Sequence, residues 1–201
     1  MKLILACTAV VLLLSAVELA KPMYRRRNSI SQIYRAANIT PVPKQLLEVN
    51  IGELEITPGI EICPEDAIEM PTIAFDFDPG CYYTFLVINL DYSSIPEINP
   101  GLLQLSVNLN GDSADGLMMD ESNELASWAG PAPAPGRGPN RYVFSVYKQP
   151  EIIDTANETL LSYEVNRLGF PFEEFLETYD LSSLVAGTFF IAQYPENCCE
   201  V

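Results

Sequence analysis

The feature that most constrains the fold is a series of short runs rich in β-branched and aromatic residues, separated by Pro, Gly and acidic residues. Residues 82–90 form an unbroken apolar run, which is typical of a strand that is buried on both faces. Most other runs alternate apolar and polar side chains, which is typical of half-buried strands. The runs are residues 47–51, 54–56, 72–77, 82–90, 103–109, 142–147 and 188–194. We therefore predict a mainly β fold.

Helical patterning is confined to two segments. Phe172, Phe175, Leu176 and Tyr179 follow the spacing of one helix face, and two glutamates lie in the first turn of this helix. Residues 29–37 predict a second, shorter helix. There is no internal repeat, and a length of 201 residues suits one domain. The expected architecture is a single mainly β domain with a few peripheral helices.

The N-terminus has the pattern of a secretory signal. Lys2 supplies a positive charge, and residues 3–16 are almost wholly apolar but are too short to span a membrane. We predict a signal peptide over residues 1–20 and a basic segment over residues 21–46. No second long apolar run follows. The sequence therefore predicts a secreted protein without a transmembrane segment.

Export makes the cysteines candidates for disulfides. Cys7 leaves with the signal, and the four that remain are Cys63, Cys81, Cys198 and Cys199. Cys198 and Cys199 are adjacent and poorly placed to pair with each other. We expect each of them to pair with Cys63 or Cys81, which would tie the tail, residues 195–201, to the domain. The choice between these two pairings stays open.

Three short motifs suggest processing of an exported chain. Asn38-Ile39-Thr40 and Asn157-Glu158-Thr159 are sequons in polar, loop-like contexts, so Asn38 and Asn157 are candidate N-glycosylation sites. Residues 25–27 are three consecutive arginines. They have two interpretations, a convertase cleavage site or the solvated face of a helix.

Charge is distributed very unevenly along the chain. The net charge is −16, and from residue 48 to the end 26 acidic residues stand against four basic ones, a balance of −22. Such an acidic body would be repelled by nucleic acid, which we exclude as a partner. It is typical of a very soluble extracellular protein, or of one that attracts basic protein partners.

The chain contains no histidine, and this absence excludes several kinds of site. It excludes Ser-His and Cys-His catalytic pairs and His-ligated zinc, copper or haem. Residues 108–119 are rich in Asn and Asp but lack the Gly and Glu that an EF-hand requires. Asp76 and Asp78 precede a Pro-Gly turn, which favours a solvated turn over a catalytic carboxylate pair. We therefore predict no enzymatic activity, metal or cofactor.

The sequence GPAPAPGRGPN, residues 130–140, forms a loop stiffened by proline and followed by a predicted strand. It matches neither of the glycine-rich phosphate-binding motifs that precede a helix. Extended to GPAPAPGRGPNRYVFSVYKQ, it resembles the signature of the phosphatidylethanolamine-binding protein family, in which a Gly-Pro-rich loop runs into His-Arg-Tyr and an apolar strand. Four other segments are similar in the same order, namely LEVNIGELEITPG, PTIAFDFDPGCYYTFLVINLDYSS, LLQLSVNLNG and FEEFLETYDLSSLVAGTFFIAQY. The resemblance covers roughly residues 47–194.

The resemblance implies a β-sandwich with a few helices and a small anion pocket that binds phospholipid headgroups. Residues at positions matching that pocket are Asp91, Leu103, Gly130, Gly138, Asn140 and Tyr142. Asn89-Leu90-Asp91 stands where the family has Asp-Pro-Asp, and the family's closing C-terminal helix is replaced by the cysteine-containing tail. Leu103 and Asn140 stand where the family has two histidines. A charge-assisted hydrogen bond contributes about 1.5–3 kcal/mol, so losing two imidazoles weakens phosphate binding.

From these departures we expect a secreted, non-enzymatic binding protein with a remodelled pocket for a small neutral ligand or a lipid headgroup. The alternative is an interaction or protease-inhibitor protein whose acidic surface meets a basic partner. The resemblance implies this alternative because family members resemble inhibitors of kinases or proteases, and an exported chain would meet a protease. Taken alone, Arg141 is expected to pair with an acid and hold the loop. Asp91 also fits a turn cap, and Tyr142 also fits strand packing.

Overall fold

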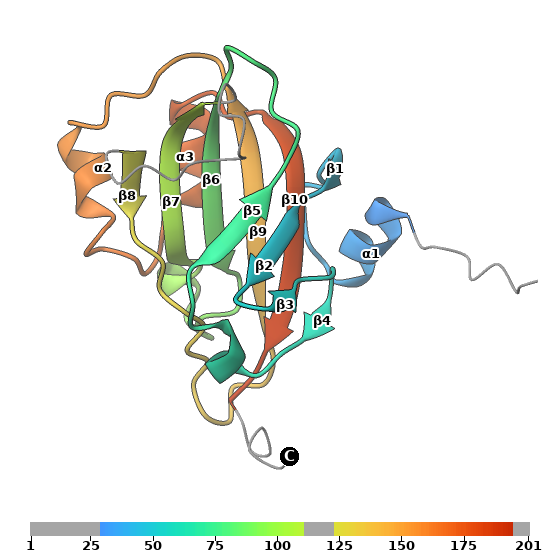
Figure 1. Ribbon diagram of the computed structural model, residues 1–201. Coiled ribbons are helices and arrows are strands. Elements are labelled where there is room, and N and C mark those ends of the chain that lie inside the picture. The colour runs from blue at the N-terminus through green and yellow to red at the C-terminus, as the bar shows by residue number, and fades with distance from the viewer. Residues whose placement is uncertain (1–28, 111–122, 195–201) are drawn as a thin grey trace, which may run out of the picture.

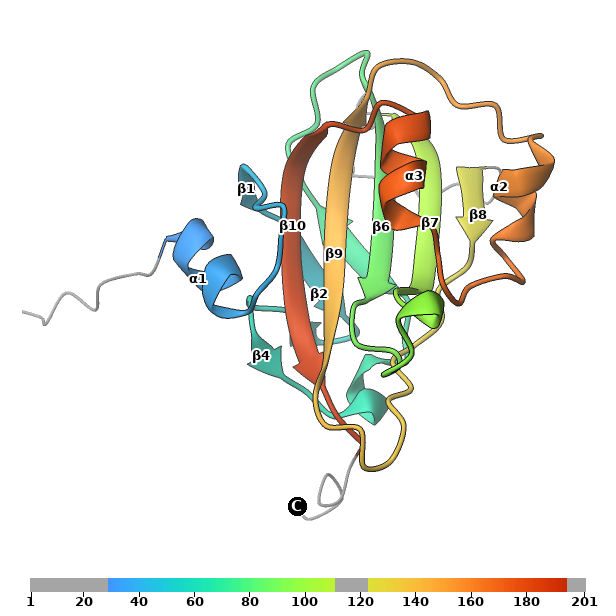
Figure 2. The same ribbon diagram turned by 180° about the vertical axis from the view of Figure 1, so that it is seen from behind.

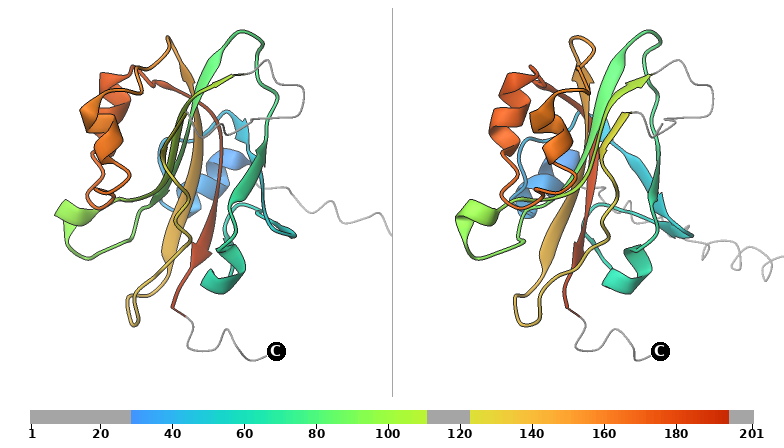
Figure 3. Two further views of the ribbon diagram at one scale, coloured as in Figure 1. Left: turned by 60° about the vertical axis from the view of Figure 1, so that its left-hand side comes forward. Right: turned by 90° about the vertical axis from the view of Figure 1, so that its left-hand side faces the viewer.

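The computed structural model describes residues 29–110 and 123–194. Its main element is a seven-stranded sheet with strand order β1-β10-β9-β6-β7-β8, in which β4 also pairs with β10 (Figure 1). A three-stranded sheet, in the order β3-β2-β5, covers one face of the large sheet. Helices α1 and α3 lie on the opposite face (Figure 2). Side views show these three layers, helices, large sheet and small sheet (Figure 3).

The strands of the large sheet are β1 (Gln45–Leu46), β4 (Ile60–Glu61), β6 (Tyr82–Asn89), β7 (Gly101–Asn110), β8 (Glu124–Ala126), β9 (Asn140–Gln149) and β10 (Ser183–Ala192). Those of the small sheet are β2 (Glu48–Ile51), β3 (Leu54–Glu55) and β5 (Pro71–Ala74). The helices are α1 (Ile30–Ala36), α2 (Glu158–Ser162) and α3 (Phe172–Thr178), with 3-10 turns η1 (Pro64–Ala67) and η2 (Pro96–Ile98). The prediction of a mainly β fold with peripheral helices is confirmed.

Strand alternation divides the buried side chains between two cores. The inter-sheet core lies between the two sheets and includes Val49, Phe85, Tyr142, Phe144 and Phe190. The helix-side core lies on the other face of the large sheet, under the helices. It includes Tyr34, Leu86, Tyr147, Phe175 and Phe189. Strand β6 contributes to both cores, which explains why its sequence is apolar at almost every position.

Helix α1 is defined by its first turn and by one buried residue. Ser29 and Gln32 form a reciprocal capping box. Tyr34 is the buried residue of this helix, and its ring meets Phe189 edge-on at 5.3 Å. Together with Ile39, it brings part of the predicted basic segment into the helix-side core. The division of the chain into residues 1–20, 21–46, 47–194 and 195–201 itself stays a prediction.

Several elements differ from the sequence-based expectation, among them two strand boundaries and one helix. Strand β5 ends at Ala74, because Phe75 and Phe77 leave the sheet and pack edge-on against each other and against Tyr83. Strand β10 begins at Ser183, five residues before the predicted start at residue 188. Helix α2 was not predicted, because its five residues are too few to display a helical period.

Candidate ligand-binding site

The candidate site lies where β6 ends and β9 begins, on the face of the large sheet that meets the small sheet. In the strand register, Asn89 of β6 is opposite Tyr142 of β9, and Tyr142 is opposite Phe190 of β10. Asn140 lies two residues before Tyr142 and therefore shares its face. The three polar residues are almost completely buried, with exposed fractions of 2% for Asn89 and 1% each for Asn140 and Tyr142.

Apolar side chains line the same place. The rings of Tyr142 and Phe190 are stacked, with centroids 4.8 Å apart and an interplanar angle of 12°. Leu103 belongs to the same inter-sheet core. It is the extra residue where the register of β6 and β7 shifts, since Val87 is opposite Gln104 and Ile88 is opposite Leu102. Such a bulge redirects one side chain, and here it adds Leu103 to the site.

The polar atoms of the site carry no formal charge. Neither Asn140 Oδ1 nor Tyr142 Oη makes a hydrogen bond of regular geometry to a described residue, although both atoms are buried. Burial raises the pKa of Tyr142, an effect that the neighbouring Asn140 side chain opposes and the Asp91 carboxylate reinforces. Tyr142 is therefore a neutral phenol at physiological pH. The site combines apolar walls with uncharged amide and hydroxyl groups.

Asp91 forms an ion pair at the edge of this site. Arg141 donates to it through its backbone N–H and Nε, both 2.8 Å from Oδ2, and through Nη2, 2.7 Å from Oδ1. Arg141 Nη1 also donates to the backbone carbonyls of Ala37 and Asn38, just after α1. Burial tends to raise the pKa of Asp91, but the bonds and charge of Arg141 lower it overall, so the carboxylate stays ionised. The expected pairing of Arg141 with an acid is confirmed.

The Gly-Pro loop meets the site at both of its ends, since Asn140 is its last residue and the residues around Gly130 contact neighbouring segments. Ala129 N–H donates to the Leu103 carbonyl at 2.9 Å. The indole N–H of Trp128 donates to the Ile68 carbonyl at 3.0 Å, just after η1. Gly130 lies against the same segment, because a Cβ there would be 3.3 Å from Ile68 Cα. Gly138 is exposed and has a φ of +75°, and a Cβ there would meet no atom within 4 Å. Its role is therefore the backbone conformation of the loop.

The structure thus brings together part of the set predicted as ligand contacts. Leu103, Asn140 and Tyr142 share the inter-sheet face, whereas Asp91 is engaged by Arg141. Asn89 was absent from the predicted set. The sequence contained a signal for Asn89, because the alternation of β6 puts residues 83, 85, 87 and 89 on one face. Asp91 follows the end of the strand and pairs with Arg141 instead.

The predicted disulfides are partly wrong, and the predicted glycosylation sites and the turn at Asp76 and Asp78 lie at the surface. Cys63 takes part in a disulfide, whereas Cys81 has a free thiol and packs against the inter-sheet core, so the expectation that Cys81 is paired is wrong. Cys198, Cys199 and residues 111–122 lie outside the described residues. Asn38 and Asn157 are both exposed, and their glycosylation stays a prediction. Asp78 forms a surface ion pair with Lys148 at 2.8 Å.

Comparisons with known proteins agree with this architecture. The 26 kDa secreted antigen of Toxocara canis is 26% identical over 159 residues, which is 77% of this chain and 59% of the antigen, so this chain spans less than two thirds of that protein. The putative odorant-binding protein A5 of Drosophila melanogaster is 27% identical over 158 residues, 77% of this chain and 73% of that protein.

Two solved structures have the same fold. Carboxypeptidase Y inhibitor, solved in complex with its cognate proteinase, has a TM-score of 0.66 and 20% identity, with 82% of this chain and 94% of that chain covered. A phosphatidylethanolamine-binding protein from Plasmodium vivax has a TM-score of 0.58 and 15% identity, with coverage of 84% and 98%. The sequence model "Phosphatidylethanolamine-binding protein" matches residues 64–190, more than half of the chain. The chain therefore belongs to the phosphatidylethanolamine-binding protein family.

Proposed function

We propose that the protein is a secreted, non-enzymatic binding protein whose pocket takes a small neutral ligand with an apolar body and a hydroxyl, carbonyl or amide group. The observation that carries this proposal is the neutral character of the site. Asn89, Asn140 and Tyr142 present amide and phenol groups among apolar side chains, and Leu103 occupies a position where the family has a histidine.

The same chemistry argues against phosphate as the ligand. Removing an anion from water is costly unless charged or multiple donors replace its hydration. The nearest cation, Arg141, already binds Asp91 and the carbonyls after α1. A neutral ligand has a much smaller desolvation cost, and one hydrogen-bond donor on it would satisfy a buried acceptor that now lacks a regular partner, such as Asn140 Oδ1.

Further observations support export and a non-enzymatic role. One relative is named a secreted antigen and another a putative odorant-binding protein, and within residues 29–110 and 123–194 no helix could span a membrane. The chain has no histidine to act as a general base near neutral pH. The raised pKa of Tyr142 also makes its phenol a poor base there.

The test uses Trp128, the single tryptophan of the chain, as a reporter. Inorganic phosphate and phosphorylethanolamine are titrated into the wild-type protein, the Leu103→His/Asn140→His variant and a Leu103→Met/Asn140→Gln control. The wild type and the control are expected to show no saturable fluorescence change, and the double histidine variant is expected to gain phosphate binding. Equal phosphate affinity in the wild type and the histidine variant would overturn the proposal.

Native mass spectrometry of the secreted, deglycosylated protein then examines what the pocket carries. A mass excess that disappears on denaturation, and that corresponds to a compound without a phosphate group, supports a neutral ligand. A phosphate ester in that position would contradict it. Absence of any carried mass, together with no retention of a mixed panel of aliphatic alcohols and amides, would also reject the pocket as a binding site.

A second candidate function, inhibition or capture of a basic protein, is favoured by the charge of the body. From residue 45 to residue 136 the chain contains no Lys or Arg. The carboxypeptidase Y inhibitor has the same fold, although at 20% identity the likeness concerns the fold alone. Titration against basic serine and carboxypeptidase-type proteases at low and high salt tests this candidate. Inhibition that weakens with salt supports it, and absent or salt-independent inhibition rejects it.

A further inference from the structure

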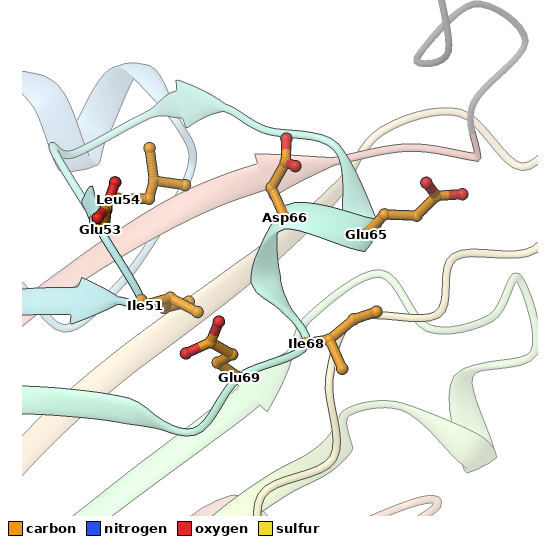
Figure 4. Close-up of a pocket in the computed structure, with 8 residues that line it drawn as sticks. Ile51, Glu53, Leu54, Glu65, Asp66, Ile68 and Glu69 are labelled. Atoms are coloured by element: carbon orange, nitrogen blue, oxygen red, sulfur yellow. The ribbon is translucent and has the colours of Figure 1, made fainter.

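A concave surface lies at one end of the small sheet, between the turn after β2 and the stretch from η1 towards β5 (Figure 4). It is an open cleft of about 570 Å³, which we name the acidic cleft. Its lining residues are Ile51, Gly52, Glu53, Leu54, Glu65, Asp66, Ile68 and Glu69. Figure 4 shows that they come from two facing segments, the turn after β2 and the stretch from η1 towards β5. The cleft is therefore built by two segments that are close in sequence and that flank the β2–β5 strand pair.

The floor of the acidic cleft is apolar. Ile51 is buried beneath it and Leu54 is half-buried beside it. Ile68 projects at its edge with 66% of its surface exposed, and Met70 follows with 45% exposed. Exposed apolar side chains next to a concave surface offer area that a partner can cover. A partner that fits here therefore presents at least one apolar side chain.

The rim of the acidic cleft is uniformly negative. Glu53, Glu65, Asp66 and Glu69 contribute four carboxylates, and none of them forms an ion pair with another described residue. The nearest basic residues along the chain are Lys44 and Arg137. Charge complementarity at such a surface selects a cationic partner and speeds its association.

The spacing of the carboxylates distinguishes between a metal ion and a basic peptide segment as the cationic partner. Within the described residues, no three acidic or cysteine side chains are close enough to hold a metal ion. The carboxylates instead surround an apolar floor, which suits cations separated along an extended chain with an apolar side chain between them. We propose that the acidic cleft docks a basic, extended segment of a partner protein, with its Lys or Arg side chains at the rim and an apolar residue between them over Ile68.

This proposal is independent of the ligand pocket, but Trp128 reports on both. Its indole N–H donates to the carbonyl of Ile68, the residue at the edge of the acidic cleft. A peptide that covers Ile68 is therefore expected to change the emission of Trp128. A small ligand bound in the pocket would also change the emission of Trp128, but its affinity would not change when the charges of the acidic cleft are removed.

The experiment measures binding of a fluorescein-labelled peptide, acetyl-Lys-Arg-Leu-Arg-Lys-amide, to the full secreted chain by anisotropy at low salt. The cleft variant is Glu65→Gln/Asp66→Asn/Glu69→Gln. The matched control is Glu97→Gln/Glu151→Gln/Glu177→Gln, which removes the same charge from exposed positions on other elements. We expect the cleft variant to bind about ten-fold more weakly, and the control to stay within about two-fold of the wild type.

A second variant addresses the apolar floor without changing charge. Ile68→Ser is expected to weaken binding of the peptide about three-fold or more, and the fold should be unaffected because Ile68 is exposed. Equal losses in the cleft and control variants would mean non-specific attraction and would overturn the proposal, as would unchanged binding in all variants. Binding seen only after removal of residues 21–28 would assign the cleft to the chain's own basic segment and overturn docking of a partner.

Discussion

Arg141 holds the carboxylate of Asp91 from three donors, with Nη2 2.7 Å from Oδ1 and both Nε and the backbone N–H 2.8 Å from Oδ2. The same guanidinium bonds the carbonyls of Ala37 and Asn38. One residue therefore joins the ends of β6 and β9 to the chain after α1. The pair also means that the carboxylate next to the candidate site already has a counter-charge.

Asp91→Asn is expected to lower the free energy of unfolding by about 1–3 kcal/mol, because it leaves a partly buried guanidinium without its counter-charge. Urea denaturation of the wild type and the variant measures the difference. Asp76→Asn is the control, since Asp76 is exposed and loses the same charge. The control should change stability by less than about 0.5 kcal/mol. Equal effects of the two changes would contradict a structural role for the ion pair.

The Asp91–Arg141 pair also predicts an acid dependence of stability. Arg141 outweighs the effect of burial and lowers the pKa of Asp91 in the folded state. The stabilisation is therefore present above the unfolded-state pKa of about 3.9 and is lost as the pH falls through the lower folded-state pKa. The stability gap between the wild type and Asp91→Asn, measured in urea at about pH 6 and about pH 3, should narrow at the lower pH. A gap that is unchanged between the two would rule out this linkage.

Three buried tyrosines predict a loss of stability in alkali. Burial raises the pKa of Tyr34, Tyr142 and Tyr147 above the usual value. In the unfolded chain these phenols ionise near pH 10, so above about that pH the unfolded state binds fewer protons than the folded state. Stability should therefore fall as the pH rises above about 10, with phenolate absorbance at these positions appearing only with unfolding. Phenolate absorbance that develops at these three positions while the fold stays intact would contradict this.

The close approach of Tyr34 to Gly187 predicts that a side chain added at position 187 of β10 will disturb the packing. A Cβ on Gly187 would lie 2.9 Å from Tyr34 Oη and 2.9 Å from the Phe144 carbonyl oxygen. Gly187→Ala is expected to destabilise the protein by about 1–3 kcal/mol through overpacking. Tyr34→Phe removes one of the two clashing atoms, so it should recover part of this loss in the double variant. Additive effects in the thermodynamic cycle would show that the two residues do not interact.

The different states of Cys63 and Cys81 predict different responses to serine substitution. Cys63 takes part in a disulfide, and Cys81 has a free thiol. Cys63→Ser is expected to cost about 2–5 kcal/mol of stability. Cys81→Ser should cost less than about 1.5 kcal/mol, because it only replaces a half-buried thiol. Denaturant titrations and thiol counting under non-reducing conditions distinguish the two, and a lost disulfide in Cys81→Ser would reverse the assignment.

The β-rich fold was readable from the sequence because strand periodicity is a local property. Residues 82–90 contain enough apolar side chains for both faces of a central strand, and β6 occupies that position. The start of β10 was not readable, because residues 183–187 become a strand only by pairing with β9 and β1. Helix α2 depends in the same way on the Asn157 cap and on the burial of Leu160.

The sequence by itself determined the mainly β fold, the family and the absence of histidine chemistry, since these depend on composition and on motifs read along the chain. The tertiary structure decided which groups share the candidate site. Alternation along β6 places Asn89 on the inter-sheet face, and Asp91 can turn away to pair with Arg141 because the strand has already ended at Asn89. The bulge in β7 adds Leu103, and pairing of distant strands sets Tyr142 on Phe190. These contacts join residues far apart in sequence, so only the folded chain specifies them.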